Sequence, residues 1–592
     1  MFFPPTKVLY VDLDKKDYKI EDRKDLFEKY VGGLGVAVAL FEEECLRGVD
    51  PYAPENPIVF AIGPLSGHFP VATKTVAVFK SPVTKGYGES YAGGRSAFSI
   101  AMAGYGAMVV KGASDKPVYI AVHNYKVQIK DATTLWGMRS TYAVGRVLAE
   151  VEPGKGRRTI FRIGPAGERL VCFANVMVEV YRHFGRLGLG AVFGSKKLKA
   201  MVISGTNQYP ITRRSDYIKA YNDIFNEVVK TGKMRKYHDL GTAVNVRPLN
   251  EIKALPTRNL TASRFEHADD ISGEVFAETY LIRKISCIPC PIGCIHIASL
   301  RIPFDVGYDY ESLYVPYDYE PIFALGSMIG TSTPAGLLKL IERVDRHGLD
   351  AMQAGVLLAW ITEAYQKGLI SESDLNGVKP EWGNVENYLT IVDHMVYSDN
   401  EFYATLRKGF RELVEKYGGE DFALHYNGNA MPGYHCGPAT VVGYTIGLRH
   451  SHLDNAGYSL DQKTLKSPLS PEEQVEKLVK EEQWRCLLNS LVICLFARGV
   501  YTEENVLKAL KAVGLDLTQE DLWRIAKEIY GKRLEIKIRE EGFNPLKLHI
   551  AKRVFETETS HGMLSKEQIE KMLKHYVEVV EKEYGVKLPN ER

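Results

Sequence analysis

The chain has 592 residues, of which 45% are hydrophobic, and its 75 Lys and Arg residues balance 73 Asp and Glu residues. This composition predicts a globular protein of roughly two to four domains and provides no strong field for nucleic acid or an anionic membrane surface. The longest apolar run near the C-terminus, residues 491–497, is far shorter than the roughly 20 residues that span a bilayer, so we expect no membrane span.

The start of the chain and its cysteines predict the compartment. Residues 1–7 lead to Asp12 and Asp14 before an apolar segment of signal-peptide length can form, so we expect no secretion signal. The 8 cysteines include a cluster of three, which fits a reducing compartment where thiols bind metal and do not form disulfides. We therefore expect a cytoplasmic protein.

Residues 1–208 have the pattern of a β-rich domain. Short runs rich in β-branched and aromatic residues occur at 7–12, 75–79, 107–111 and 200–204. Glycine-rich segments separate these runs, as turns between strands do.

Three glycine clusters occur in this domain, at residues 32–35, 93–95 and 185–190. Glycines let a backbone approach a ligand and direct N–H groups at phosphate oxygens. The Gly188-Leu-Gly190 pattern lacks the third glycine spacing and the βαβ unit of a dinucleotide site. Taken singly, each cluster is more often a tight turn.

The pattern becomes helical beyond Pro210. Residues 350–364 are apolar at helical spacing, and residues 471–496 predict another long helix. Ser470, Pro471 and Glu473 supply its N-cap, first turn and capping-box acid. With a boundary at Gly418-Gly419, we predict helical domains at 209–420 and 421–592, and an α+β fold class overall.

Three thiols lie within eight residues of each other, in Cys287-x-x-Cys290-x-x-x-Cys294. This spacing lets all three converge on one metal centre. A single zinc ion would usually use a second Cys-x-x-Cys pair or histidines at short spacing, and no second pair is present. A cubane iron–sulfur cluster uses four thiolates, commonly a tight run with one remote cysteine.

The fourth thiolate has three candidates by sequence, Cys436, Cys486 and Cys494. Ligand spacing favours an iron–sulfur cluster, and a zinc staple completed by His296 is the alternative.

Asp345 opens the segment Asp345-Arg-His-Gly-Leu-Asp350, whose spacing recurs in Asn489-Ser-Leu-Val-Ile-Cys494. A carboxylate beside a flat heterocycle with adjacent N–H and NH2 donors, such as a pterin, accepts two hydrogen bonds at once. If this motif stood alone, a carboxylate at a helix N-terminus would be the more ordinary explanation.

Together these motifs resemble the tungsten-containing aldehyde:ferredoxin oxidoreductase family. The resemblance runs in colinear order over nearly the whole chain and includes the glycine clusters. Further matches are Ser81-Pro-x-Thr84, Asp318-Tyr-Glu320 and the segment from Arg539 to Phe543.

The resemblance implies a metal held by the dithiolenes of two pterins, one four-iron, four-sulfur cluster, and a magnesium ion that bridges the pterin phosphates. Tungsten is expected from the resemblance alone, because the cofactor sulfurs bind the metal and no residue separates tungsten from molybdenum. Cys287, Cys290, Cys294 and Cys494 would ligate the cluster. The positions assigned to the pterins and their phosphates are Lys74, Gly93, Gly94, Arg95, Arg182, His183, Gly185, Gly188, Gly190, Asp345, Leu349, Asp350, Asn489 and Ile493.

Some residues depart from the family pattern. Asn489 replaces an aspartate and loses the charge assistance of a carboxylate, while Lys74 replaces a planar arginine fork with a point charge. The helix around 339–350 lacks the Glu-x-x-His pair that binds iron between subunits of some homodimers. We expect a dimer, either a homodimer or a heterodimer with a small polyferredoxin-like subunit.

The implied reaction oxidises an aldehyde with water to a carboxylate and passes two electrons through the cluster to ferredoxin. Glu320 and His452 match the family's active-site residues. Glu320 would accept a proton if burial raises its pKa. His450 and His435 are near His452 in sequence, so the histidine that takes part stays open.

Two alternatives remain. A subunit of the same fold could reduce the ring of an aromatic acyl-CoA thioester. A zinc-stapled binding or scaffold protein would belong to a different class. The sequence does not define which aldehydes are used.

Overall fold

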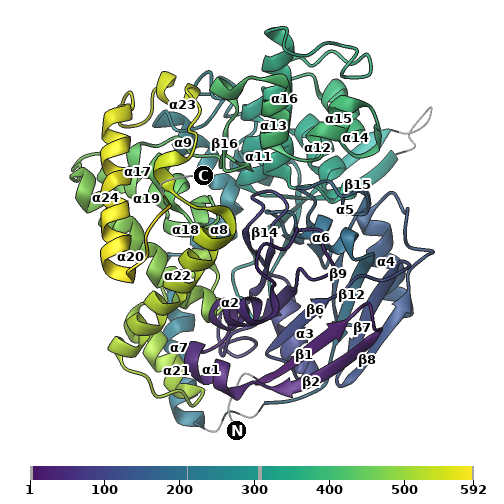
Figure 1. The fold of residues 1–592 in the computed structure, drawn as a ribbon, viewed down its shortest axis with the longest axis vertical. Coiled ribbons are helices and arrows are strands. Elements are labelled where there is room, and N and C mark those ends of the chain that lie inside the picture. The colour runs from purple at the N-terminus through teal and green to yellow at the C-terminus, as the bar shows by residue number, and fades with distance from the viewer. Residues whose placement is uncertain (1–4, 210, 212, 304–309, 590–592) are drawn as a thin grey trace.

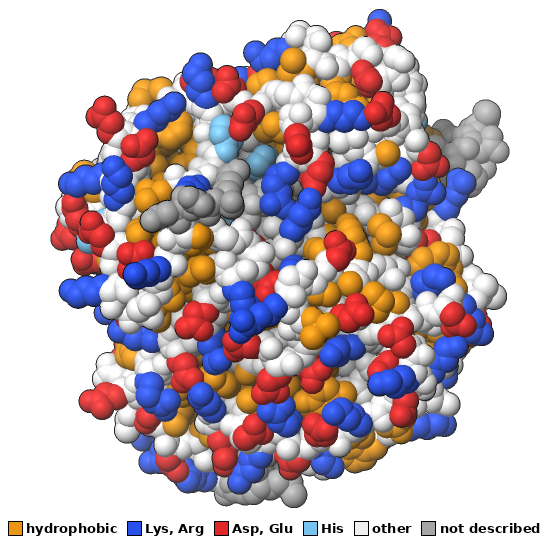
Figure 2. All heavy atoms as spheres, in the orientation of Figure 1, with side chains coloured by type: hydrophobic (Ala, Val, Ile, Leu, Met, Phe, Trp, Pro, Cys, Tyr) orange, Lys and Arg blue, Asp and Glu red, His pale blue; other side chains and the backbone are white. Residues whose placement is uncertain are grey.

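The computed structural model describes residues 5–209, 211, 213–303 and 310–589. Residues 1–4, which contribute to the prediction of no secretion signal, lie outside this set. Within the described ranges, none of the helices combines the length and apolar character that crossing a bilayer requires. On the face shown in Figure 2, Lys and Arg side chains are interspersed with Asp and Glu.

Two six-stranded sheets form the N-terminal part of the chain (Figure 1). The first has the order β2-β1-β6-β3-β4-β5 and the second the order β11-β10-β9-β12-β7-β8. The strands are β1 (Lys7–Asp12), β2 (Asp17–Asp22), β3 (Ile58–Ala61), β4 (Thr75–Lys80), β5 (Tyr87–Ala92), β6 (Ala107–Lys111), β7 (Val118–His123), β8 (Lys126–Asp131), β9 (Thr159–Arg162), β10 (Val176–Val178), β11 (Arg182–Phe184) and β12 (Leu198–Ser204).

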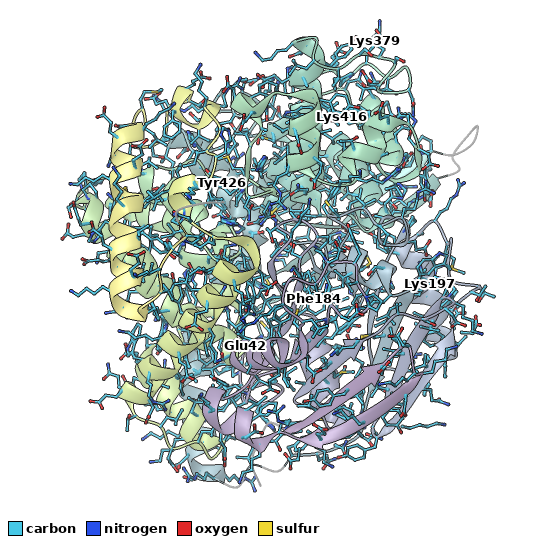
Figure 3. The ribbon with its side chains drawn as sticks, in the orientation of Figure 1. Glu42, Phe184, Lys197, Lys379, Lys416 and Tyr426 are labelled. Atoms are coloured by element: carbon cyan, nitrogen blue, oxygen red, sulfur yellow. The ribbon has the colours of Figure 1, made fainter. Side chains whose placement is uncertain are left out.

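Alternation along the strands builds the core between these sheets. In β1, Leu9 and Val11 belong to an apolar cluster with residues of the second sheet, whereas Val8 and Tyr10 face the opposite side. The ring centroid of Phe60 in the first sheet lies 5.3 Å from that of Phe161 and 5.5 Å from that of Phe184 in the second sheet. Phe184 is labelled in Figure 3. The β-rich prediction for this region is therefore confirmed.

Helices dominate the rest of the chain, which confirms the α+β fold class. This part of the chain also contains a three-stranded sheet, formed by β13 (Leu281–Ile285), β14 (Ile295–Pro303) and β15 (Tyr310–Tyr317), and a hairpin formed by β16 (His425–Tyr426) and β17 (Asn429–Ala430). The helices of the N-terminal part are α1 (Lys24–Tyr30), α2 (Gly33–Glu44), α3 (Ser96–Ala103), α4 (Thr141–Val151), α5 (Pro165–Glu168) and α6 (Leu189–Ser195). Those that follow are α7 (Arg214–Lys230), α8 (Arg235–Asp239), η1 (Gly241–Asn245), α9 (Val246–Glu251), α10 (Gly273–Thr279), α11 (Tyr319–Leu325), η2 (Ser327–Ile329), α12 (Pro334–His347), α13 (Ala351–Gln366), α14 (Val385–Tyr397), α15 (Glu401–Leu406), α16 (Phe410–Tyr417) and η3 (Glu420–Phe422). The last are α17 (Pro438–Ile446), α18 (His452–Asn455), α19 (Gly457–Thr464), α20 (Pro471–Ser490), η4 (Leu495–Ala497), α21 (Glu503–Ala512), α22 (Gln519–Glu541), η5 (Pro545–Lys547), α23 (Arg553–Glu556) and α24 (Lys566–Tyr584).

The predicted long helix starts as expected but ends early. Ser470 caps α20 and Glu473 completes the capping box. The helix stops at Ser490, and Val492 then takes a left-handed backbone conformation with φ of 52°. This turn directs the chain toward Cys494 instead of continuing the helix to 496.

The first glycine cluster is a packing device. α2 lies between the first sheet and the helices α20 and α22 (Figure 1). Gly33 has φ of +40°, and a side chain there would meet the carbonyl oxygens of Asn489 and Ser490. The Gly35 N–H donates to Ser490 Oγ at 3.0 Å. This cluster therefore brings the end of α20 against the β-rich part.

We expect Gly33→Ala to lower the melting temperature of the apo-protein by several degrees, because it adds a clash with the end of α20 to the strain of a left-handed backbone. Gly48→Ala is the matched control, since Gly48 has φ of +68° with nothing within 4 Å of an added Cβ. Calorimetry measures both variants. Equal losses would show that the close approach to α20 is not important.

Candidate functional site

A cavity of about 330 Å³ lies where the β-rich part meets the helices. Segments from distant parts of the chain line it, around Lys74, β5, Arg182, the Cys287 loop and the turn after α20. The predicted site residues on its wall are Lys74, Arg182, Gly185, Cys287, Cys290, Cys294, Glu320, His452, Asn489, Ile493 and Cys494.

Backbone hydrogen bonds bring the four thiols together. The Val71 N–H donates to Pro289 O at 3.0 Å, within the Cys-x-x-Cys loop, and the Cys494 N–H donates to Val71 O at 2.9 Å. The Gly94 N–H donates to Cys287 Sγ at 3.2 Å. The structure therefore brings Cys494 to the cavity with the three clustered cysteines.

The other two candidates for the fourth thiolate do not line this cavity. Cys436 and Cys486 are fully buried elsewhere. Arg533 donates to Cys486 Sγ at 3.2 Å, which gives that thiol a structural role.

The protein environment makes Cys290 and Cys294 poor anions without a bound cation. Burial raises the pKa of Cys294 to about 12 and also raises that of Cys290. Burial lowers the pKa of Lys74, but the negative charges of Cys494 and Cys287 outweigh it, so that its pKa is raised overall. Metal binding would supply the positive charge that deprotonates the thiols.

The zinc-staple alternative does not fit the geometry. His296 Nε2 lies 3.1 Å from His238 O, and its Nδ1 lies 3.4 Å from the Tyr317 hydroxyl. His296 does not line the cavity with the thiols. Across the described residues, no three Cys, His, Asp or Glu side chains are grouped to hold a single metal ion.

Unpartnered polar atoms mark the same wall as a binding site for an anionic, hydrogen-bonding group. Arg182 pairs with Asp318 at 3.2 Å, yet its buried Nε has no partner among the described residues. Arg186 Nη1 and Asn429 Oδ1 are likewise buried and without partners there. The Asn489 amide has no hydrogen bond within the described part of the chain and faces the cavity. Buried polar groups normally find partners, so these residues fit pterins and their phosphates.

Asp345 lies in the last turn of α12, so the explanation of a helix N-terminal carboxylate is wrong. Its Oδ1 is 3.4 Å from His183 Nε2, and the Tyr142 hydroxyl donates to its Oδ2 at 3.5 Å. Burial, and after it the charge of Glu342, raises the pKa of Asp345 to about 8. Burial, and after it Arg182, lowers the pKa of His183 to about 3.

Asp350 caps a helix and orients a cation. Its Oδ1 accepts from the Met352 N–H at 2.9 Å, and its Oδ2 accepts from Arg186 Nε at 3.3 Å. The preceding Leu349 forms a backbone bridge with Ala174.

Some residues of the glycine clusters lie at the cavity, and others serve the packing of the β-rich part. A Cβ on Gly93 would lie 2.7 Å from Cys287 Sγ, so this glycine lets β5 approach the thiols. Gly188 and Gly190 pack against the carbonyl oxygens of Cys172 and Asn175 and do not line the cavity. Arg95 begins α3 and lines a separate cavity.

Glu320 and His452 form a hydrogen-bonded pair on the cavity wall. His452 Nε2 and the Tyr434 hydroxyl both lie 3.2 Å from Glu320 Oε1. Glu320 Oε2 has no partner among the described residues, and the Glu320 side chain is 23% exposed. Burial raises the pKa of Glu320, but the hydrogen bond and charge of His452, together with the Tyr434 hydrogen bond, outweigh burial and lower this pKa overall, so the condition of a raised pKa is not met. Burial also lowers the pKa of His452, which keeps this ring neutral.

The loop before His452 is rigidly held. Arg449 Nε donates to Asp454 Oδ1 at 2.6 Å, and the Ser451 N–H donates to Asp454 Oδ2 at 3.1 Å. Ser451 also caps α18. This ring of bonds fixes where His452 begins the helix.

His450 and His435 do not line the cavity. His450 Nδ1 donates to Tyr444 O at 2.9 Å, and His435 Nε2 donates to Thr557 O at 3.0 Å. Among these three histidines, the geometry therefore favours His452 as the site residue.

The sequence did not reveal most of the other residues that line this cavity. Arg186 and Arg449 had a usable signal, because each lies inside a motif that was noticed. The aromatic residues had none, since they come from unrelated segments. The missed lining residues include Glu89, Tyr91, Arg186, Met234, Tyr237, Asn429, Arg449, Tyr458 and Phe496.

Comparison with known proteins assigns the chain to a family. A family model described as "Aldehyde ferredoxin oxidoreductase, N-terminal domain" matches residues 8–205, and one described as "Aldehyde ferredoxin oxidoreductase, domains 2 & 3" matches residues 219–583. A tungsten-containing aldehyde ferredoxin oxidoreductase from Thermococcus kodakarensis is 32% identical, covering 91% of this chain and 89% of that protein. The Pyrococcus furiosus protein of the same name is 31% identical, covering 88% and 87%.

A solved structure shares the fold. The active-site complex BamBC of benzoyl coenzyme A reductase, in complex with 1,5-dienoyl-CoA, superposes with a TM-score of 0.81 at 21% identity, covering 98% of this chain and 95% of that chain.

The family matches and the named relatives show that the chain is an oxidoreductase. The chain belongs to the aldehyde ferredoxin oxidoreductase family, whose named relatives contain tungsten. This confirms the resemblance inferred from the motifs and overturns the scaffold alternative.

We expect Asp345→Asn to stabilise the apo-protein increasingly as the pH rises. The folded-state pKa of about 8 lies above the ordinary 3.8, so ionising Asp345 favours unfolding between these values. The gain in melting temperature should be absent near the lower value and largest above the upper one. Asp516→Asn is the control, because Arg213 lowers the pKa of this exposed group and the effect should be small and of opposite sign. A gain independent of pH would contradict the assignment.

Proposed function

We propose that this enzyme oxidises aldehydes with water to carboxylates, using a tungsten bis-pterin centre and one four-iron, four-sulfur cluster. The balanced half-reaction is RCHO + H2O → RCOO⁻ + 3H⁺ + 2e⁻. The observation that carries the proposal is the convergence on one cavity of four thiols, of arginines with unpartnered buried nitrogens, and of the Glu320–His452 pair.

The residues present fit both cofactors. Cys287, Cys290, Cys294 and Cys494 would hold the cluster, since they line one wall and no other described cysteine does. Lys74, Arg182, Arg186, Asp345 and Asn489 would hold the pterins and, with a bridging Mg²⁺, their phosphates. When bound, the tungsten centre supplies a two-electron acceptor, and the cluster passes those electrons on singly. Molybdenum would be held by the same residues.

Glu320 is the proton-handling residue in this proposal. With Oε1 occupied by His452 and Tyr434, the ionised carboxylate presents Oε2 to the cavity, where it orients water and accepts its proton. His452 positions the carboxylate through Nε2. Tyr434 stacks on Tyr458 with ring centroids 4.2 Å apart, which holds the hydroxyl in place.

We propose ferredoxin as the electron acceptor, either separate or as a ferredoxin-like subunit of a dimer. The names of the relatives, aldehyde ferredoxin oxidoreductases, support an acceptor of this kind. A relative in Pyrococcus furiosus is named as a subunit of a sulfonate oxidoreductase, which supports assembly with a second chain.

Reduction of an aromatic acyl-CoA ring is the second candidate. It rests on the fold shared with the benzoyl-CoA reductase complex, and 21% identity carries no activity. The identity of 32% to a named aldehyde oxidoreductase favours aldehyde oxidation.

The proposal is tested with protein purified without oxygen from cells grown with tungstate. Tungsten near one and iron near four per chain, with reduction of a viologen dye by simple aldehydes, are expected. Dye-linked reduction of an aromatic acyl-CoA without aldehyde oxidation would favour the second candidate. The absence of both activities in a fully loaded enzyme would refute the proposal.

We expect Cys494→Ser to lower the bound iron well below the roughly four ions per chain of an intact cubane cluster, because one thiolate is lost. Cys436→Ser is the control, since Cys436 is buried away from the cavity. Iron analysis and visible absorption measure the outcome. An iron content that stays near four per chain in Cys494→Ser would exclude Cys494 as a ligand.

Removing a hydrogen bond from Glu320 should move the acid limb of kcat/KM to higher pH. The pKa of Glu320 is lowered below 4.5, so activity of the native enzyme should fall only below that pH. Tyr434→Phe removes one donor and raises this pKa, whereas Tyr458→Phe preserves both donors and should leave the limb in place. Glu320→Gln should lose roughly 10²- to 10⁴-fold in kcat. An acid limb well above 4.5 in the native enzyme would contradict control by Glu320.

A further inference from the structure

One buried cation behind the cavity has no role in the proposed function. Arg485 lies on α20, and its side chain is 3% exposed. Arg485 Nη1 donates to Leu453 O in α18, the helix that begins at His452. Arg485 Nε pairs with Glu481 Oε1 at 2.9 Å, whereas Arg485 Nη2 is buried and has no hydrogen-bond partner among the described residues. The guanidinium therefore keeps spare hydrogen-bonding capacity beside the segment that carries His452.

The helix α20 also fixes the loop around His452 at two other points. Glu482 Oε1 accepts from the Leu448 N–H at 3.1 Å, and Glu482 Oε2 accepts from Asn455 Nδ2 at 3.3 Å. Glu482 and Arg485 are three residues apart on the helix, so their side chains are neighbours on one face. The backbone on both sides of His452 is therefore held by α20.

The environment of the His452 ring defines its protonation. Burial lowers the pKa of His452, and the charges of Arg186 and Arg485 lower it further, whereas Glu320 raises it. A neutral ring carries one proton, which lies on Nε2 because this atom is 3.2 Å from the Glu320 carboxylate. His452 Nδ1 is buried and has no partner among the described residues. The groups that face the ring are Glu320, Arg186, Arg485, Tyr434 and Tyr458.

The two cations on His452 differ in their exposure to ligands. Arg186 lines the cavity and would be engaged by the cofactors in the proposed function. Arg485 does not line the cavity, so its charge acts on the ring whether or not the cofactors are bound. A guanidinium does not lose its proton in a protein, so this charge is constant over the working range of pH.

We propose that Arg485 is a positioning residue, which keeps His452 as the neutral donor to Glu320. A second proton on His452 would pair an imidazolium with the Glu320 carboxylate and make that carboxylate a weaker base. The cation of Arg485 opposes this second proton, and its bond to Leu453 O fixes the turn from which the ring extends. This inference rests on the proposed role of Glu320 and adds the residue that preserves it.

The test measures the pKa of individual histidines in the loaded enzyme. Exchange of the imidazole Cε1 hydrogen with deuterium is followed over a series of pH values by mass spectrometry, and peptide fragmentation assigns it to single residues. We expect Arg485→Gln to raise the pKa of His452 by roughly one, because a nearby cation is lost. Arg485→Lys keeps the charge and should leave this pKa close to that of the native enzyme. His435, which binds Thr557 O away from the cavity, is the internal reference.

The matched control variant is Arg498→Gln. Arg498 has the same charge and acts on Tyr458, but the cations that act most strongly on His452 are others. This control should leave the pKa of His452 unchanged. The proposal is overturned if Arg485→Gln leaves that pKa unchanged, if the control raises it equally, or if Arg485→Lys behaves as Arg485→Gln does.

The pH profile of aldehyde oxidation supplies a second readout. In Arg485→Gln the acid limb of kcat/KM should move to higher pH, mainly through kcat, because the residues of the cavity wall are unchanged. Arg485→Lys should restore the native limb. An equal loss of activity at every pH would show a purely structural role and overturn the proposal. If the native enzyme oxidises no aldehyde, the exchange measurement still decides the role of Arg485, so the two failures are distinguished.

Discussion

The segment from Val71 to Lys74 is the element on which the site depends. Its backbone bonds the Cys287 loop through Pro289 O and the Cys494 turn through the Cys494 and Lys74 N–H groups, with Lys74 N–H reaching Val492 O at 3.1 Å. Each such bond adds only about 1 kcal/mol net. Together they fix two cysteine-bearing segments from distant parts of the chain against one strand-like support, and α2 packs the end of α20 onto the same β-rich base.

Charge is the second constraint. Arg449 pairs with Glu89 at 3.4 Å, and Arg533 reaches the same carboxylate at 2.9 Å, all within the protein interior. Buried ions of this kind are costly unless each is matched. Glu89 and Arg449 carry this network onto the cavity wall, where Arg182 and Arg186 each keep a buried nitrogen without a hydrogen-bond partner among the described residues. The cavity is therefore lined by cations whose ion pairs leave hydrogen-bonding capacity unused.

The sequence predicted those features of the fold and the site that depend on short motifs. The Cys287 triplet, the capping box of α20 and the alternation in β1 depend on near neighbours in the chain, so spacing alone revealed them. Cys494 could not be chosen over Cys436 by spacing, because its selection depends on a bond to Val71. Tyr237 and Phe496 were missed for the same reason. The raised pKa that was the condition for proton transfer to Glu320 is not found, because contacts with His452 and Tyr434, invisible in sequence, outweigh its burial.

The location of Cys494 also has a consequence for biogenesis. Three thiols belong to one loop, while the fourth arrives only after the chain has passed through α20 and turned back onto Val71. If the four cysteines hold the proposed cluster, a nascent chain would present an incomplete ligand set until residue 494 of 592 has been synthesised. Cluster insertion would then have to wait for this turn, and a chain truncated before it would lack the fourth thiol.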